Sequence, residues 1–378
     1  MKIKKIEVYV IGPEERHYTW SEDIPEVYQT NTIIRIFTDE NIIGEAAVWN
    51  ATYFEYDKYT AESLRHLLPI LINKDPIDRE AILYDIRPRV FPQPPGAQAL
   101  IDNGLWDIFG KASNLPIYKL LGGRRDKIKS YASTVMYDTI DEYLQVIEKM
   151  KNEGFTAVKF HTWCIPEKDL ELAKAARKAF PNMSLMLDAE NNYDLESSLR
   201  IAKELDKLDF TWFEAPLPDY DFVGYKKITE SVGIKVLPSG NWITDLQRFS
   251  DALNNKVWSA ARTDMAMIGG ITNGKKAMDI SSINGFDCEI MSWGYTLVSA
   301  ANLHLMLSSD NCTYYEQPLP YEMFEYGMHD ILRTNKDGYM YAPIKPGLGM
   351  EVNWELMKKR VIHSFICDEN KKIGFVHS

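Results

Sequence analysis

The chain has 378 residues, of which 45% are hydrophobic and 26% charged, a composition typical of a globular protein. Its formal net charge of −11, without a run of Lys or Arg, argues against a nucleic-acid partner. No apolar stretch approaches the ~18 residues of a membrane span, so we expect no membrane partner. The four cysteines form no Cys-x-x-Cys pair, which argues against structural zinc and favours reduced thiols in a cytoplasmic protein.

The first third of the chain, residues 1–124, predicts an α+β unit. Residues 31–38 and 42–46 are strand-like and flank a short polar turn, which is a hairpin pattern. From about residue 59 the pattern becomes helical, and we expect that stretch to stop at Gly122-Gly123. Strands followed by helices are typical of an α+β unit.

Strand-like and helical segments alternate from residue 127 onward. Several helix starts carry N-terminal signals: Thr139 with Glu142, Pro166, Asp194, and Thr244 with Gln247. Alternation through Tyr315 predicts a parallel sheet, and about eight units predict a closed barrel over residues 125–330. We expect residues 331–378 to form a tail that packs back on the first unit.

Polar side chains recur along this region at intervals of roughly 25 residues, the length of one strand, one helix and two turns. Most of them follow a short apolar run, as Asp188 follows Leu185-Met186-Leu187. The set is His161, Asp188, Glu214, Asn241, Asp264 and Glu316. Strand ends of a (β/α) barrel meet at one face, so we expect these side chains to build a functional site there.

Three of these residues are candidate metal ligands. Asp188, Glu214 and Asn241 offer oxygen donors on consecutive strand ends, and oxygen donors without Cys or His favour Mg²⁺. The alternative interpretation is that each one caps the helix that follows it, since Asp and Asn are common helix N-caps.

The remaining charged residues are candidates for the chemistry itself. Lys159 and His161 lie two apart on one strand, so both face the barrel interior, where His161 would be suited to act as a base. A lone His is otherwise often a hydrogen-bonded core residue. Asp264 follows Arg262 with the same spacing, either as a catalytic group or as charge balance. Glu316 would donate a hydrogen bond to a developing enolate, or simply bind Lys159.

Segments across nearly the whole chain resemble the enolase superfamily, in particular its mandelate racemase/muconate lactonizing enzyme-like branch. The matching segments are Asp102–Lys111, Leu120–Gly123, Phe213–Pro218, Gly269–Thr272, Ser292–Gly294 and Pro346–Gly349. The resemblance implies an α/β fold, a modified (β/α)₇β TIM-type barrel under an N-terminal α+β capping domain. It also implies a Mg²⁺ cofactor that holds a substrate carboxylate, and a base that removes the neighbouring α-proton.

Carried over by position, the resemblance assigns roles to the same residues. Asp188, Glu214 and Asn241 match the metal ligands, and Glu316 matches the acidic residue of the eighth strand. In the Lys-x-His motif, Lys159 would contact the substrate carboxylate and His161 would be the base.

Two positions depart from the family pattern. The third ligand is usually acidic but is Asn241 here, and a shift of one residue would place Gly240 there instead. A neutral ligand should weaken Mg²⁺ binding. The seventh strand usually carries a His that pairs with the sixth-strand Asp, but this chain has Met291, so the sequence offers Asp264 no evident partner.

A single base favours dehydration over racemisation, which needs a base on each face of the substrate. The leading hypothesis is therefore a Mg²⁺-dependent sugar-acid dehydratase, a lyase that converts an aldonate or aldarate to a 2-keto-3-deoxy acid. The alternatives are a racemase, epimerase or cycloisomerase acting on another carboxylate, and a non-catalytic barrel. By resemblance we also expect a homo-oligomer.

Aromatic residues in the predicted capping loops are candidate substrate contacts. Tyr18, Trp20, Trp49 and Tyr53 would either stack on a substrate or pack between the two units. Arg262 and Trp293 are further candidates from the barrel.

Overall fold

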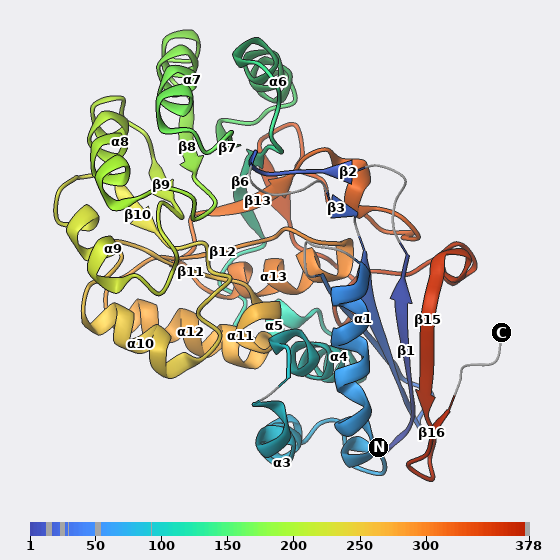
Figure 1. Cartoon of the computed structure of the whole chain (residues 1–378). Helices are drawn as coiled ribbons and strands as arrows, with labels where there is room; N and C mark the ends of the chain where they lie inside the picture. The colour runs from blue at the N-terminus through green and yellow to red at the C-terminus, as the bar shows by residue number, and fades with distance from the viewer. Residues whose placement is uncertain (13–16, 23–26, 29, 50–53, 92, 375–378) are drawn as a thin grey trace.

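A computed structural model describes residues 1–12, 17–22, 27–28, 30–49, 54–91 and 93–374 (Figure 1). Tyr53 lies outside this part of the chain, so its predicted contact with a substrate has no structural counterpart here. No described helix combines the length and the hydrophobicity that crossing a bilayer requires.

The N-terminal unit contains an antiparallel sheet that also takes in the end of the chain. The strand order is β16-β15-β1-β4-β5, and β15 pairs antiparallel with β1 (Figure 1). The strands are β1 (Ile3–Ile11), β4 (Asn31–Thr38), β5 (Ile43–Val48), β15 (Val361–Cys367) and β16 (Ile373–Gly374). The predicted hairpin is confirmed, because β4 and β5 pair antiparallel with Ile36 opposite Gly44. A two-stranded ribbon, β2 (His17–Tyr18) and β3 (Val27–Tyr28), precedes them.

Helices cover one face of this sheet. Alternate residues of β1, such as Ile6, Val8 and Val10, are buried against them, as the period of two in a strand requires. The helices on this face are α1 (Phe54–Ser63), α2 (Leu68–Leu71), α3 (Arg79–Val90) and α4 (Pro95–Ala112). The short α5 (Ile117–Leu120) follows, and its buried residues belong to the core of the barrel. The helical stretch stops before Gly122-Gly123 as expected, but it is not continuous, because α4 ends at Ala112 and the chain turns before the short α5.

The middle of the chain forms the predicted barrel, with strands in the order of the sequence. The strands are β6 (Lys127–Ser133), β7 (Ala157–His161), β8 (Ser184–Asp188), β9 (Trp212–Glu214), β10 (Lys235–Leu237), β11 (Ala261–Thr263), β12 (Cys288–Ile290) and β13 (Tyr314–Pro318). The parallel ladder runs β13-β6-β7-β8-β9-β10, with β11-β12 as a second pair. Backbone hydrogen bonds connect the two parts, from Ser259 N to Val236 O (3.0 Å) and from Cys288 N to Asn311 O (2.6 Å).

A helix follows each barrel strand except the last, which gives the expected (β/α)₇β order (Figure 1). The helices are α6 (Ile140–Asn152), α7 (Pro166–Ala179), α8 (Leu195–Lys207), α9 (Phe222–Thr229), α10 (Leu246–Asn254), α11 (Met265–Ile268), α12 (Ile271–Ile283) and α13 (Thr296–Ser308). After β13 the chain continues through β14 (Tyr339–Tyr341), which pairs with β6, and α14 (Trp354–Met357).

The predicted helix starts are confirmed with one exception. Thr139 and Glu142 form a capping box, and the Asp194 side chain accepts from Ser197 N. The box predicted at Thr244 is wrong, because the cap lies one residue later, where Asp245 accepts from Arg248 N at 2.8 Å. An aspartate is at least as good an N-cap as a threonine, and here it takes the position.

Large side chains fill the barrel interior below the strand ends. Tyr131, Met186, Trp212 and Leu237 are buried in one layer that closes the barrel from below. Side chains that point into the barrel nearer the carboxyl ends of the strands therefore pack on this layer. Lys159 on β7 and Glu214 on β9 are among them.

Candidate active site

A cavity of about 370 Å³ lies where the barrel strands end and the capping segments cross them. Its charged and amide-bearing lining residues are Lys159, His161, Asp188, Glu190, Glu214, Asn241 and Arg262. The rest is lined by Ser239 and by five apolar side chains, which we call the apolar wall: Trp20, Trp49, Met267, Met291 and Trp293. Of the six spaced residues, His161, Asp188, Glu214 and Asn241 line this cavity, and Asp264 and Glu316 do not.

Lys159 lies at the centre of a buried charge network. Its ammonium nitrogen lies 3.0 Å from Asp188 Oδ2, 2.7 Å from Glu214 Oε1 and 2.9 Å from Glu316 Oε1. Burial alone would lower the pKa of Lys159, but these carboxylates outweigh it and raise the pKa. Each of its three N–H groups has a carboxylate partner, so Lys159 would exchange one of them to bind a substrate carboxylate.

Arg262, the second buried cation, connects two of the three acids of this network, Glu214 and Glu316. Its Nε lies 2.8 Å from Glu214 Oε1 and its Nη2 lies 2.7 Å from Glu316 Oε2. Glu316 also accepts from Ser133 Oγ and from Trp293 Nε1, each at 2.9 Å, and its side chain does not line the cavity. Glu316 is therefore placed to orient the two cations.

The three buried carboxylates of the network differ in proton affinity. Burial raises the pKa of Glu214 to about 8, and the neighbouring Asp188 and Glu316 add to the rise against the opposing effect of Arg262 and Lys159. Burial acts in the same direction on Asp188 and Glu316, but the adjacent cations outweigh it and hold both pKa values below the usual range. The raised pKa of Glu214 shows that Lys159 and Arg262 do not fully compensate the three buried carboxylates, so a further cation beside Glu214 would favour its ionised form.

His161, at the end of β7, presents one ring nitrogen to the cavity. Nδ1 is hydrogen-bonded to the backbone oxygen of Thr134, so Nδ1 carries a proton and Nε2 faces Asp188 Oδ2 at 3.2 Å and Glu190 Oε1 at 3.1 Å. Burial alone would lower the pKa of His161, but the two carboxylates raise it to about 9. In the ligand-free protein the imidazole is therefore held as the cation.

Asn241 has the features of a metal ligand that is held in place by its loop. Its Oδ1 is buried without a hydrogen-bond partner among the described residues. The loop is fixed by the buried Asp219 carboxylate, which accepts from Ser239 N (2.7 Å), Gly240 N (3.1 Å) and Trp242 N (3.3 Å). A free amide oxygen that lines the same cavity as the carboxylates of Asp188 and Glu214 fits a hard cation such as Mg²⁺.

Gly240, the alternative third position, has no room for a side chain. Its φ is +82°, and a Cβ would lie 3.0 Å from the backbone of Thr263. Of the two positions that the sequence left open, only Asn241 can therefore offer a side-chain ligand.

Glu190 is the residue at this cavity that the sequence reasoning missed. With His161 and Asp188 it forms a group whose ligand atoms lie within 4.8 Å of one another, an arrangement that could also hold a cation. Its φ of +47° is rare for a residue with a side chain and is typical of functional sites. The signal was present in the sequence, because Glu190 follows Asp188 by two residues, as His161 follows Lys159.

Three predicted site residues lie outside the described cavity lining: Glu316, whose contacts are given above, Asp264 and Tyr18. Asp264 caps α11, accepting from Ala266 N at 2.5 Å, and its other oxygen accepts from Asn302 Nδ2 at 3.2 Å. The expectation that Asp264 lacks a partner is therefore wrong, because α13 supplies one. Tyr18 is half-buried against the hydrophobic core.

Comparisons with known proteins agree with this architecture. Residues 142–356 match the enolase C-terminal domain-like family, and residues 23–122 match the N-terminal domain of the mandelate racemase/muconate lactonizing enzyme family. A crystal structure from Pseudovibrio sp., described as that of a mandelate racemase/muconate lactonizing enzyme, superposes with a TM-score of 0.93 at 36% identity, covering 97% of this chain and 98% of that chain.

Several curated relatives are dehydratases, and others are o-succinylbenzoate synthases and racemases. A D-galactonate dehydratase from Pectobacterium atrosepticum is 28% identical over 95% of this chain and 94% of its own length. A cis-3-hydroxy-L-proline dehydratase from Roseibium aggregatum is 26% identical over 96% of this chain and 99% of its own. With both family domains in sequence and a matching fold, the chain belongs to the enolase superfamily, in its mandelate racemase/muconate lactonizing enzyme branch.

Proposed function

We propose that the protein is a Mg²⁺-dependent dehydratase of a hydroxy carboxylate, removing the α-proton and then the β-hydroxyl as water. The observation that carries the proposal is His161 Nε2, a single ring nitrogen aimed into a cavity that also holds Asp188, Glu214 and Asn241. The two dehydratase relatives share this reaction type, while one name specifies a sugar acid and the other a hydroxy amino acid.

The proposed metal ligands are Asp188, Glu214 and Asn241. A bound Mg²⁺ would supply the positive charge that makes the α-proton of a carboxylate acidic enough to remove. Lys159 and Arg262 keep the acids of the site in place through direct contacts with Glu214 and Glu316. Lys159 would also contact the substrate carboxylate.

His161 would be the base. Thr134 fixes the ring orientation through Nδ1, so Nε2 can take the α-proton. The same proton would then leave with the β-hydroxyl as water. An α-hydroxyl substrate would thereby give an enol that becomes the 2-keto acid, and an α-amino substrate would give an enamine that becomes the imine. His161 can act as a base only when it is neutral, so Asp188 must turn from His161 toward another cation. As a proposed metal ligand, Asp188 would have the bound Mg²⁺ as that cation.

The position of His161 favours dehydration over racemisation. Racemisation needs a second base across the substrate, and the strands opposite β7 in an eight-stranded barrel are β11 and its neighbours. The described residues that line the cavity on this side, from β11, β12 and the turns that follow them, are Arg262, Met267, Met291 and Trp293. Arg262 is held in ion pairs and the others cannot accept a proton, so a one-base reaction fits this cavity better.

The test is α-proton exchange in deuterated water together with 2-keto acid formation. The panel is D-galactonate, D-gluconate, galactarate and cis-3-hydroxy-L-proline, each with Mg²⁺ and with a chelator. We expect metal-dependent exchange for at least one acid. The exchange should be lost in His161→Gln and retained in His329→Gln, because His329 is distant in sequence from the site residues. Exchange that persists in His161→Gln would show that another group is the base.

A further inference from the structure

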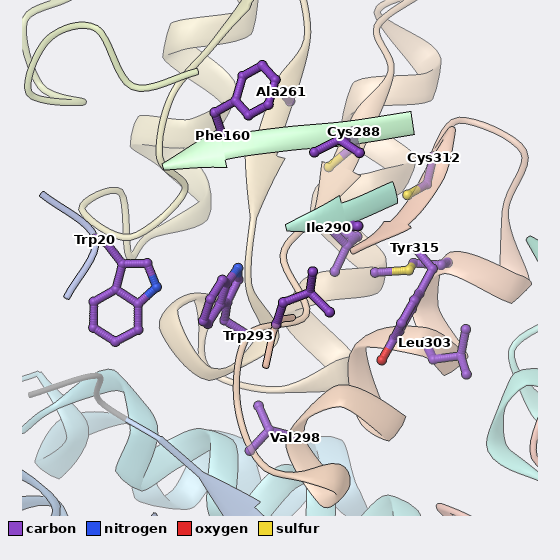
Figure 2. Packing of buried hydrophobic residues seen from close by; sticks show 14 of the residues in the cluster. Trp20, Phe160, Ala261, Cys288, Ile290, Trp293, Val298, Leu303, Cys312 and Tyr315 are labelled. Carbon is purple, nitrogen blue, oxygen red and sulfur yellow. The ribbon is translucent and has the colours of Figure 1, made fainter. Parts of the chain in front are cut away.

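The part of the cavity beyond the charge network is walled by three indole rings. The ring centroids of Trp20 and Trp293 lie 5.4 Å apart and those of Trp20 and Trp49 lie 6.0 Å apart, with the rings steeply inclined. Trp49 and Trp293 are nearly parallel, at 18° and 6.3 Å. Figure 2 shows Trp20, from the N-terminal segment, beside Trp293 of the barrel.

Few polar groups remain in this cavity for a chain of hydroxyls. Ser239 Oγ is used by Asp219 and by the backbone of Asn241. The indole N–H of Trp49 is buried without a partner among the described residues, so it can serve one oxygen of a ligand. A sugar acid would bury several further hydroxyls against indole and thioether groups, and each unpaired hydroxyl is costly.

Glu190 adds a negative charge that the proposed reaction does not use. Its side chain is 22% exposed, it lines the cavity, and one of its oxygens lies 3.1 Å from His161 Nε2. The ring of Trp293 meets the same imidazole edge-on at 5.4 Å, so Glu190 and the apolar wall both adjoin His161. A carboxylate and an electron-rich ring therefore border the same space.

Glu190 differs from the other carboxylates of the site in its partners. Asp188, Glu214 and Glu316 each lie within 3.0 Å of Lys159 or Arg262, whereas the ion-pair contact of Glu190 is with His161. A positive charge on the substrate would give Glu190 a cation partner of its own.

We propose that Glu190 and the apolar wall recognise a positively charged nitrogen, a quaternary or protonated amine, on the part of the substrate away from its reacting carboxylate. This inference rests on the proposed function for the position of that carboxylate. Indole faces attract cations and tolerate methyl groups on them, and a carboxylate completes such a site. The substrate class is then a cationic hydroxy acid in place of an aldonate or aldarate.

The test compares two probes that differ in one charge. L-Carnitine is a 3-hydroxy carboxylate with a trimethylammonium group, and 3-hydroxy-5,5-dimethylhexanoate is its isostere with carbon in place of nitrogen. Each is titrated into the whole protein at saturating Mg²⁺, followed by calorimetry, with D-gluconate as a neutral polyol. We expect L-carnitine to bind at least about tenfold more tightly than its isostere and than D-gluconate, a difference of about 1.4 kcal/mol.

The variants locate the effect. In Glu190→Gln the ratio between the two isosteres should fall toward one, while Glu196→Gln, in the first turn of α8, should preserve it. A change in Mg²⁺ affinity would move both isosteres equally and leave their ratio intact. Equal binding of the two probes by the unmodified protein overturns the inference, as does a ratio that survives in Glu190→Gln.

The proposed function can fail separately. If a neutral acid of the first panel exchanges its α-proton and no cationic preference is found, the dehydratase proposal stands and the cation site falls. If L-carnitine is preferred but no acid exchanges, the cation site stands and the proposed chemistry falls.

Discussion

Replacing Lys159 with Met would test whether its ammonium balances the buried acids. The methylene stem of the side chain is largely kept, while three carboxylates lose the cation that lies 2.7–3.0 Å away. A pKa of about 8 already leaves Glu214 largely protonated at pH 7, so Asp188 or Glu316 must then take up a proton in the folded state. At pH 7, protonating a carboxyl with an ordinary pKa near 4.3 costs about 3.7 kcal/mol, which sets the size of the expected destabilisation.

The sign of the pH dependence follows from the same argument. The newly protonated carboxyl has a folded pKa above its unfolded one, so its cost is fully present at neutral pH and shrinks as the pH falls toward the unfolded pKa. At pH 5 the cost should be only about 1 kcal/mol. The free energy of unfolding relative to the unmodified protein should therefore recover by close to 3 kcal/mol between pH 7 and pH 5.

Urea unfolding of both proteins at pH 5, 6 and 7, in chelator, measures this difference. Lys149→Met is the matched control, because Lys149 is 68% exposed and should change the free energy of unfolding by less than about 0.5 kcal/mol. Mg²⁺ should then stabilise Lys159→Met more than it stabilises the unmodified protein. A Lys159→Met protein that is as stable as the original at pH 7 would refute the charge-balance account of the site.

Three further predictions concern the metal ligands and the junction of the two domains. Asn241→Asp adds a carboxylate to the proposed ligands and should tighten Mg²⁺ binding by about tenfold or more, while Asn241→Ala weakens it, both measured by calorimetry; no change in either variant would remove Asn241 from the site. Asp219→Asn frees the loop that positions Asn241 and should weaken Mg²⁺ binding by about 10- to 100-fold, and an unchanged affinity would show that the loop holds without it. Burial raises the pKa of Asp102 from 3.8 to about 6, so stability from this group falls as pH rises between those values, by about 3 kcal/mol in total. Asp102→Asn should remove that fall in urea unfolding from pH 4 to 7, and an identical pH profile would contradict it.

The sequence predicts the barrel well because its signals are local and repeated. Each strand–helix unit carries its own apolar run and often its own cap, as Asp194 does for α8. Parallel strand ends must meet at one face, so the spacing alone was enough to expect residues as distant in sequence as Lys159 and Glu316 near each other.

The details that the sequence could not give depend on where turns aim their side chains. Asp264 and Glu190 both lie just beyond strand ends, yet Asp264 caps α11 while Glu190 turns into the cavity through a left-handed backbone. Asn302 lies on a helix one strand further along, and no pattern connects it to Asp264. The direction in which each of these side chains points is determined by tertiary contacts and not by its spacing in the sequence.

The neutral ligand Asn241 is easier to understand once Glu190 is included. An acid in place of Asn241 would give the cavity three strand-end carboxylates, and here the third negative charge lies instead in the turn after β8, 3.1 Å from His161. Coulomb attraction for a divalent ion falls only slowly over a few ångströms in a buried site, so this charge still favours cation binding. Its new position has a second effect, because a carboxylate beside the base and the indole rings can also act on the substrate. One relocated charge can thus preserve affinity for the metal and change the class of molecule that the cavity accepts.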